Sequence, residues 1–97
     1  FDAIDVRDDI GALWENFLVV ERIKRNKYIE PYKSIYFWRK LSGAEVDFIE
    51  TYSNNIDGYE FSFKQKKNEK SKKSWLEDYP KATWKNIHKE NFREFVL

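Results

Sequence analysis

The sequence predicts one small α+β domain whose elements follow the order αβββαβ. Apolar residues recur at three- and four-residue steps near the N-terminus, and three later segments alternate apolar and polar residues. A lysine-rich run then precedes a short helical pattern and a last strand-like segment. Because 97 residues suffice for one hydrophobic core, we expect a three-stranded antiparallel meander plus a fourth strand, with a helix on each face of the sheet.

A helix is predicted over residues 9–25. Asp8 and Asp9 suit its first turn, since acids there complement the helix dipole. Its apolar positions follow helical spacing and are Ile10, Leu13, Trp14, Phe17, Leu18 and Val20. We expect the helix to pack on the sheet through Leu13, Trp14 and Phe17.

Three strands are predicted next. Residues 34–40 (SIYFWRK) are rich in β-branched and aromatic residues that fit a pleated surface. After a Ser42-Gly43 turn, residues 44–51 alternate apolar and polar side chains. The polar residues 53–55 indicate a second turn, and residues 58–65 alternate again as a third strand.

The second half of the chain predicts a loop, a helix and a strand. Residues 64–73 carry six Lys, one Glu and no apolar residue, so we expect a mobile loop that adds nothing to the core. Residues 74–79 favour a short helix ended by Pro80, and residues 82–87 favour the fourth strand. The last residues, 91–97, indicate a terminal turn or short helix.

Composition excludes several classes of protein. A net charge of +1 argues against a uniformly basic nucleic-acid binder, and zero Cys with one His leaves no Cys- or His-based metal centre. The scattered glycines Gly11, Gly43 and Gly58 form no phosphate-binding loop, so this chain itself does not bind ATP that way. Without a long apolar run we expect a cytoplasmic protein and no membrane partner. The start at Phe1 and the absence of Met suggest a fragment of a longer chain.

Three stretches of the sequence resemble a known family. They are GALWENFLVVERIKRN, IYFWRKLSGAEVDFIE and WLEDYPKATWKNIHKENFREFVL, which together span most of the chain. The chain resembles the uncharacterised C-terminal domain of bacterial and archaeal AAA-type ATPases. The resemblance implies an N-terminal ATPase domain in the same chain, where ATP binds, and a restriction-endonuclease-like, PD-(D/E)XK nuclease-like core for this part.

The resemblance also implies a metal-dependent site on neighbouring strands. In that pattern an Asp, a Glu and a Lys two residues beyond the Glu serve a divalent cation and a phosphate. The Asp falls on Asp47 and the Lys on Lys64, but the Glu position falls on Ser62, a poor Mg²⁺ ligand. Glu60 shares the predicted face but lies four residues from Lys64, about 13 Å along a strand, so only a register shift would bring it into the site.

Two further acids belong to the predicted site. Glu15 corresponds to an acid of the family pattern, and the alternative is that it caps the helix or pairs with Arg22. Glu45 lies on the strand face of Asp47 and is a weak candidate metal ligand. From the residues alone, Glu45 and Asp47 form a solvated strand face.

The densest positive charge lies in the lysine-rich run. Its lysines are candidates for contact with nucleic-acid phosphates, and the alternative is a soluble loop that shields a sheet edge. The candidates are Lys66, Lys67, Lys70, Lys72 and Lys73.

The sequence pattern also predicts where two other polar residues lie. Glu21 falls in the apolar stripe and needs a partner, either Arg25 or the sheet, and His88 is expected at the surface.

These observations favour an accessory domain of an AAA-type ATPase, with a degenerate nuclease-like site and no cofactor of its own. Two alternatives stay open. One is an active Mg²⁺-dependent nuclease on DNA or RNA, in which Asp47 and Glu60 hold the metal and Lys64 stabilises the phosphorane charge. The other is a structural module that forms a homo-oligomer.

Overall fold

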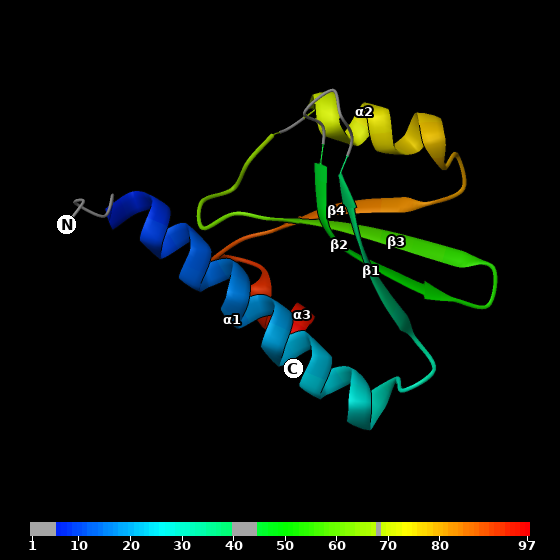
Figure 1. Cartoon of the computed structure of the whole chain (residues 1–97), viewed down its shortest axis with the longest axis horizontal. Coiled ribbons are helices and arrows are strands. Elements are labelled where there is room, and N and C mark those ends of the chain that lie inside the picture. Colours follow the sequence, from blue (N-terminus) through cyan, green and yellow to red (C-terminus); the bar gives the residue numbers. More distant parts are fainter. Residues whose placement is uncertain (1–5, 40–44, 68) are drawn as a thin grey trace.

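A four-stranded mixed sheet with three helices forms the domain (Figure 1). The computed structural model describes residues 6–39, 45–67 and 69–97, and side chains in 10–37, 47–67 and 69–97. The strands are β1 (Ser34–Arg39), β2 (Glu45–Tyr52), β3 (Asn55–Phe61) and β4 (Thr83–Ile87). The helices are α1 (Val6–Ile29), α2 (Glu69–Asp78) and α3 (Phe92–Val96).

The strands lie in the order β1-β2-β3-β4. β1 to β3 are antiparallel neighbours, and β4 runs parallel to β3 after the crossover through α2. This confirms the predicted meander and the fourth strand. The predicted Ser42-Gly43 turn lies outside the described residues. The second turn is tighter than predicted, because Ser53 takes a left-handed backbone conformation (φ 51°) and β3 already begins at Asn55.

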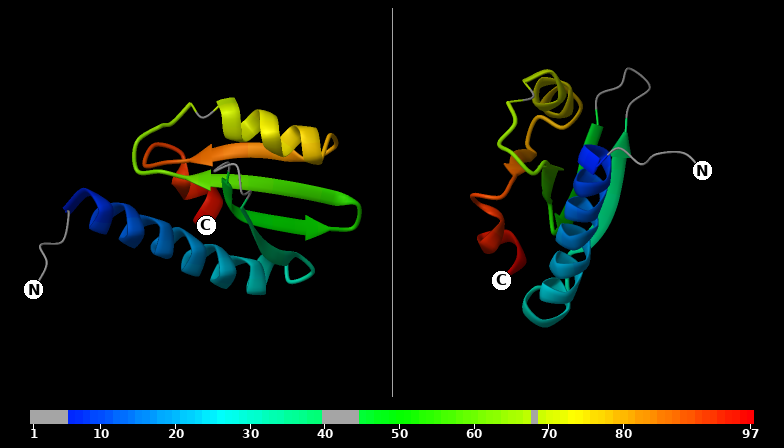
Figure 2. Two further views of the ribbon diagram at one scale, coloured as in Figure 1. Left: turned by 45° about the horizontal axis from the view of Figure 1, so that its top comes forward. Right: turned by 90° about the vertical axis from the view of Figure 1, so that its left-hand side faces the viewer.

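Helices cover both faces of the sheet, as Figures 1 and 2 show. On one face, α1 and α3 bury Leu18 and Phe95 against Phe48, Phe61 and Ile87. The opposite face carries α2, whose Trp75 packs with Ile49. Partly buried side chains surround these two residues, namely Ile56, Leu76, Ala82 and Trp84. The alternation along β2 therefore separates two apolar clusters, since Phe48 and Ile49 point to opposite faces.

The lysine-rich run is not all loop. α2 begins at Glu69, five residues before the predicted start, and Ser71 is buried with Trp75 one turn later. An acid in the first turn suits the helix dipole, and a small Ser needs little room beside the sheet. The prediction that residues 64–73 add nothing to the core is therefore wrong for the part that begins α2.

A close approach holds α2 to the sheet. A Cβ built on Gly58 would lie 2.8 Å from the Trp75 indole, so only glycine fits beneath that ring. The Trp75 Nε1 donates a hydrogen bond of 2.8 Å to the Thr83 carbonyl oxygen. Gly58 thus lies within β3, where it leaves room for the Trp75 ring.

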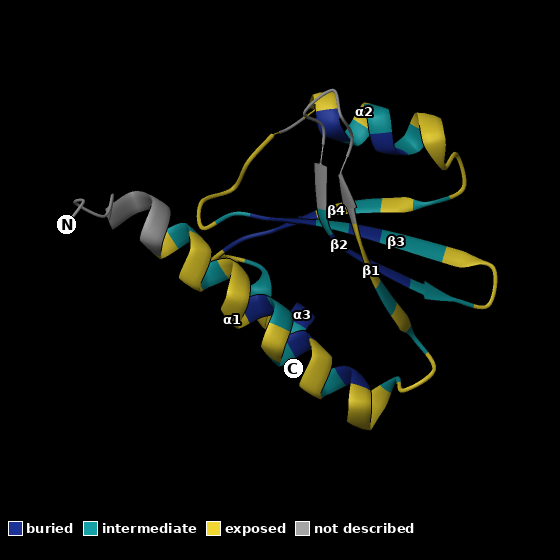
Figure 3. Cartoon of the chain, viewed as in Figure 1, coloured by how far each residue is buried: buried dark blue, intermediate teal, exposed yellow. Residues whose placement is uncertain are grey.

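The face of α1 that meets the sheet is more polar than predicted. Leu18, Arg22 and Asn26 are buried, whereas Leu13 and Phe17 are exposed. The prediction that Leu13 and Phe17 pack on the sheet is therefore wrong, although Trp14 is half-buried and donates through Nε1 to the Ser62 carbonyl at 2.8 Å. Figure 3 shows that buried and exposed residues alternate along α1.

Glu50, fully buried on β2, explains these polar residues. Arg22 donates to it from Nε (2.8 Å) and Nη2 (2.7 Å), and Asn26 donates from Nδ2 at 2.6 Å. Burial alone would raise the pKa of Glu50, but these hydrogen bonds and the charge of Arg22 and Lys33 hold that pKa below its ordinary value. The same carboxylate holds the pKa of Arg22 above its ordinary value against the effect of burial.

Two polar residues lie elsewhere than predicted. Glu21 is half-exposed and pairs with Lys24 at 3.4 Å, so it is Arg22, one step around the helix, that joins α1 to the sheet. His88 is buried, because it follows β4 into the turn before α3, where Asn91 Oδ1 accepts its backbone N–H at 2.8 Å. Within the described chain, no helix combines the length and apolar character needed to cross a membrane.

Candidate functional site

Two acidic residues meet where β2 and β3 run side by side. Phe48 pairs with Tyr59, and continuing this antiparallel register by one residue puts Asp47 opposite Glu60. Asp47 is the sequence neighbour of Phe48, and Glu60 lies between Tyr59 and Phe61. Because Phe48, Tyr59 and Phe61 pack on the face covered by α1 and α3, Asp47 and Glu60 belong to the opposite face, which α2 covers. Asp47 Oδ2 accepts the backbone N–H of Phe61 at 2.7 Å. Asp47 and Glu60 therefore lie on neighbouring strands and on the same face of the sheet.

A lysine approaches the buried Glu60 carboxylate. Lys66 Nζ lies 3.7 Å from Glu60 Oε1, with 4% of the Glu60 side chain exposed and 57% of the Lys66 side chain exposed. The Lys66 backbone N–H also donates to Asn86 Oδ1 at 2.9 Å, which fixes this part of the loop beside β4. The cation beside the site is thus Lys66, whereas the sequence predicted Lys64.

Ser62 and Lys64 do not lie on the strand to which they were assigned from the sequence, because β3 ends at Phe61. Ser62 Oγ donates to the Lys64 carbonyl oxygen at 2.6 Å, so the chain turns there and Lys64 does not continue the strand face of Glu60. Ser62 Oγ also accepts from Asn86 Nδ2 at 3.0 Å. Ser62 therefore holds the loop, and the estimate of 13 Å between Glu60 and Lys64 assumed a strand that has already ended.

Asn86 is the residue that sequence reasoning missed. It is buried on β4, where Nδ2 donates to the Glu60 carbonyl oxygen at 3.0 Å as well as to Ser62. Its Oδ1 accepts from Lys66, so one side chain joins β3, β4 and the loop. The signal in the sequence was an Asn within a predicted strand, because Asn is uncommon in strands. A buried Asn side chain there is expected to make hydrogen bonds.

The two other predicted acids, Glu15 and Glu45, are not shown beside Asp47 and Glu60. Glu15 is exposed on α1, which covers the opposite face of the sheet. The Glu45 backbone pairs with Arg39, but its side chain lies outside the described residues. Of the predicted residues, Glu60 and Lys66 are in contact, and Asp47 lies on the neighbouring strand of the same sheet face.

Sequence comparison assigns this fold to a family. Residues 10–94 match a domain of unknown function, DUF4143. The chain belongs to the DUF4143 family. No curated protein and no solved structure matches it. The DUF4143 match includes both Asp47 and Glu60, together with all of β2, β3 and β4.

The site of this DUF4143 chain does not fit Mg²⁺ as it is arranged. A hard dication needs oxygen ligands in near-octahedral geometry, usually with one or two carboxylates. Here Asp47 Oδ2 accepts a backbone N–H, and an ammonium lies beside Glu60 Oε1. In the described part of the chain, no three or more His, Cys, Asp or Glu residues form a group that could hold a metal ion.

The predicted phosphate-binding lysines follow β3 in the loop and in the first part of α2. Lys64, Lys66, Lys67, Lys70 and Lys73 are exposed, whereas Lys72 is half-buried with Nζ 6.0 Å from the Trp84 ring centroid. Of the DUF4143 lysines proposed for phosphate contact, Lys72 thus has a packing role and Lys66 faces Glu60. Lys67, Lys70 and Lys73 are those whose exposure suits contact with an extended anion.

Proposed function

We propose that the chain is a cytoplasmic accessory domain of an AAA-type ATPase, with a nuclease-like core whose carboxylate site is closed by an internal lysine. The order αβββαβ, the antiparallel meander and the parallel fourth strand support the core. In this proposal ATP binds to an ATPase domain of the same chain, and this domain uses no cofactor.

One observation carries the closed site: Lys66 Nζ lies 3.7 Å from the buried Glu60 carboxylate. A dication entering at Glu60 would meet the positive charge of this ammonium, which opposes binding. A lysine without a metal attracts phosphate but does not generate hydroxide at neutral pH. We therefore expect no cleavage of DNA or RNA by the 97-residue chain in Mg²⁺ or Mn²⁺.

Cation binding tests the closed site directly. Lys66→Met removes the ammonium but keeps the length of the side chain, so Mn²⁺ should bind measurably more tightly by isothermal titration calorimetry. Lys67→Met is the matched control, because Lys67 is the neighbouring exposed lysine. Equal Mn²⁺ affinity in Lys66→Met and in the unmodified chain would contradict the proposal that Lys66 closes the site.

An active nuclease is the second candidate, favoured by the position of Asp47 and Glu60 on neighbouring strands and one face of the sheet. Its signature is metal-dependent cleavage by the unmodified chain that disappears in Asp47→Ala and Glu60→Gln but persists in Lys67→Met. That result would replace the accessory role with catalysis.

Phosphate contact is tested separately on the exposed lysines. The triple variant of Lys67, Lys70 and Lys73 to Glu should weaken DNA binding in fluorescence anisotropy and flatten its dependence on salt. Lys81→Glu serves as the control, since Lys81 is exposed and follows α2. An unchanged salt slope in the triple variant would remove nucleic acid from the list of partners.

A further inference from the structure

Asn86 is a buried amide whose side chain meets β3 and the loop that follows it. Its Nδ2 donates 3.0 Å hydrogen bonds to the Glu60 carbonyl oxygen and to Ser62 Oγ, and its Oδ1 accepts the Lys66 backbone N–H at 2.9 Å. An Asn side chain offers two donor hydrogens and one acceptor oxygen, so both ends of this amide are engaged. Its orientation follows from its partners, because the Glu60 carbonyl only accepts and the Lys66 N–H only donates.

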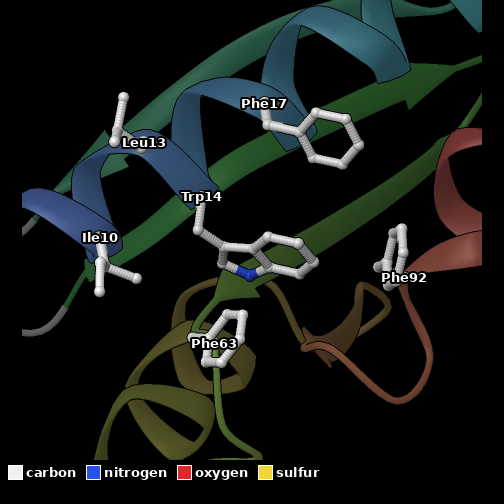
Figure 4. A pocket seen from close by; sticks show the side chains of 6 residues that line it. All are labelled: Ile10, Leu13, Trp14, Phe17, Phe63 and Phe92. Carbon is white, nitrogen blue, oxygen red and sulfur yellow. The ribbon is translucent and has the colours of Figure 1, made fainter.

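The loop after β3 is held at both ends. Its start is fixed to α1, because Trp14 Nε1 donates to the Ser62 carbonyl oxygen at 2.8 Å. The rings of Trp14 and Phe63 also meet edge to face there, with their centroids 5.4 Å apart (Figure 4). The far end of the loop is held by Asn86 Oδ1, whereas residues 63–67 are all exposed. Asn86 therefore fixes the place of the exposed far end.

The ion pair between Lys66 and Glu60 is weak by itself. The ammonium lies 3.7 Å from Glu60 Oε1, and 57% of the Lys66 side chain is exposed. An exposed ion pair contributes little, because holding a long flexible side chain in one geometry costs conformational entropy. The hydrogen bond from the Lys66 backbone to Asn86 lowers that cost, since it fixes the start of the side chain within reach of the carboxylate.

We propose that Asn86 is the positioning residue of the Glu60 site. Its hydrogen bond to the Lys66 backbone keeps the ammonium at the carboxylate, and the site opens to a cation when this bond breaks. The inference rests on the proposed function, in which Lys66 closes the site, and it adds the residue that controls the closure. Because Asn86 carries no net charge, its loss changes the charge around Glu60 only through the position of Lys66.

Mn²⁺ binding measured by isothermal titration calorimetry tests this control. Asn86→Leu keeps the size of the side chain but removes the amide, so it should raise the Mn²⁺ affinity of the chain about threefold or more. Asn91→Leu is the matched control and should leave the affinity unchanged. Asn91 also holds a turn with its amide, but it donates to the Asn86 carbonyl oxygen at 2.9 Å and accepts the His88 N–H at 2.8 Å.

Two outcomes of this titration are distinct. Tighter Mn²⁺ binding in Lys66→Met but not in Asn86→Leu overturns the role of Asn86 and leaves the closed site standing. Equal affinities in Lys66→Met, Asn86→Leu and the unmodified chain refute the closed site, and this inference with it.

A double variant separates positioning from a structural role. If Asn86 acts through Lys66, its loss has no further effect once the ammonium is gone. Asn86→Leu combined with Lys66→Met should therefore bind Mn²⁺ as tightly as Lys66→Met alone. An effect of Asn86→Leu that persists in the double variant would show that Asn86 acts on the site by another route, against the proposal.

Amide hydrogen exchange followed by NMR gives a test on the unmodified chain, so it does not depend on the folding of a variant. The protection factor of the Lys66 amide should be at least about ten times those of Gln65 and Lys67. The N–H groups of these two neighbours have no acceptor within the described residues, whereas that of Lys66 donates to Asn86. A Lys66 amide that is no better protected than its two neighbours overturns the proposal.

Discussion

Removing Arg22 while keeping Glu50 tests how α1 is held to the sheet. Arg22→Met deletes two hydrogen bonds to a carboxylate with no solvent exposure, and a third of 2.7 Å from Nη1 to the Phe95 carbonyl oxygen. Breaking a buried ion pair from one side costs about 3–5 kcal/mol, because the remaining charge is left without compensation. Asn26 and Lys33 still reach Glu50, at 2.6 Å and 3.4 Å, which places the expected loss near the lower end, about 3 kcal/mol.

Urea denaturation followed by circular dichroism measures this loss. A domain of this size gains about 5–15 kcal/mol on folding, so the variant should lose a large share of its stability and about 12–24 °C in Tm. The double variant Arg22→Met with Glu50→Leu removes both charges and should recover most of the loss. A single variant within about 0.5 kcal/mol of the unmodified chain, or a double variant less stable than the single one, would refute this account of α1 packing.

Acid and glycine substitutions give two further predictions. Burial raises the pKa of Glu50 in the folded chain, but hydrogen bonds from Arg22 and Asn26 outweigh this effect and lower it. The contribution of Glu50 to stability is therefore present above its unfolded pKa and is lost as the pH falls through its folded pKa. The urea midpoint should drop on acidification, and it should drop less in the double variant Arg22→Met with Glu50→Leu. Gly58→Ala sets a Cβ 2.8 Å from the Trp75 ring and should cost about 1–3 kcal/mol, whereas Gly11→Ala, with nothing within 4 Å, should stabilise α1 by about 0.5–1 kcal/mol; equal urea midpoints for the two variants would contradict the close-packing explanation.

Apolar residues that alternate every two residues, or recur every three to four residues, were enough to predict the meander, α1 and β4. Side chains alternate strictly along β2, so Phe48 and Ile49 each mark one apolar cluster. The same reasoning failed for the face of α1, because hydrophobic periodicity finds apolar stripes wherever they point. The sheet contacts Leu18, Arg22 and Asn26, two of which are polar, and this pairing depends on Glu50, 24 to 28 residues away in sequence.

The candidate site shows a different limit of the sequence. Asp47 and Glu60 were both named as candidates, but their proximity depends on the register that the turn at Ser53 sets. The resemblance puts the lysine of the site at Lys64, whereas Lys66 lies beside Glu60 and β3 ends at Phe61. Only the turn after β3, held by Ser62 and Asn86, brings Lys66 back to Glu60.

Glu50 and Glu60 are buried carboxylates of this sheet that are neutralised in different ways, and the difference separates stability from any activity at the site. Glu50 receives Arg22 and Asn26 from a helix, so removing those donors requires α1 to leave the sheet. Glu60 faces a lysine on a loop, and that lysine is more than half exposed. An exposed lysine contributes little to folding stability. Lys66→Met should therefore change cation binding at Glu60 while α1, Glu50 and the fold stay intact.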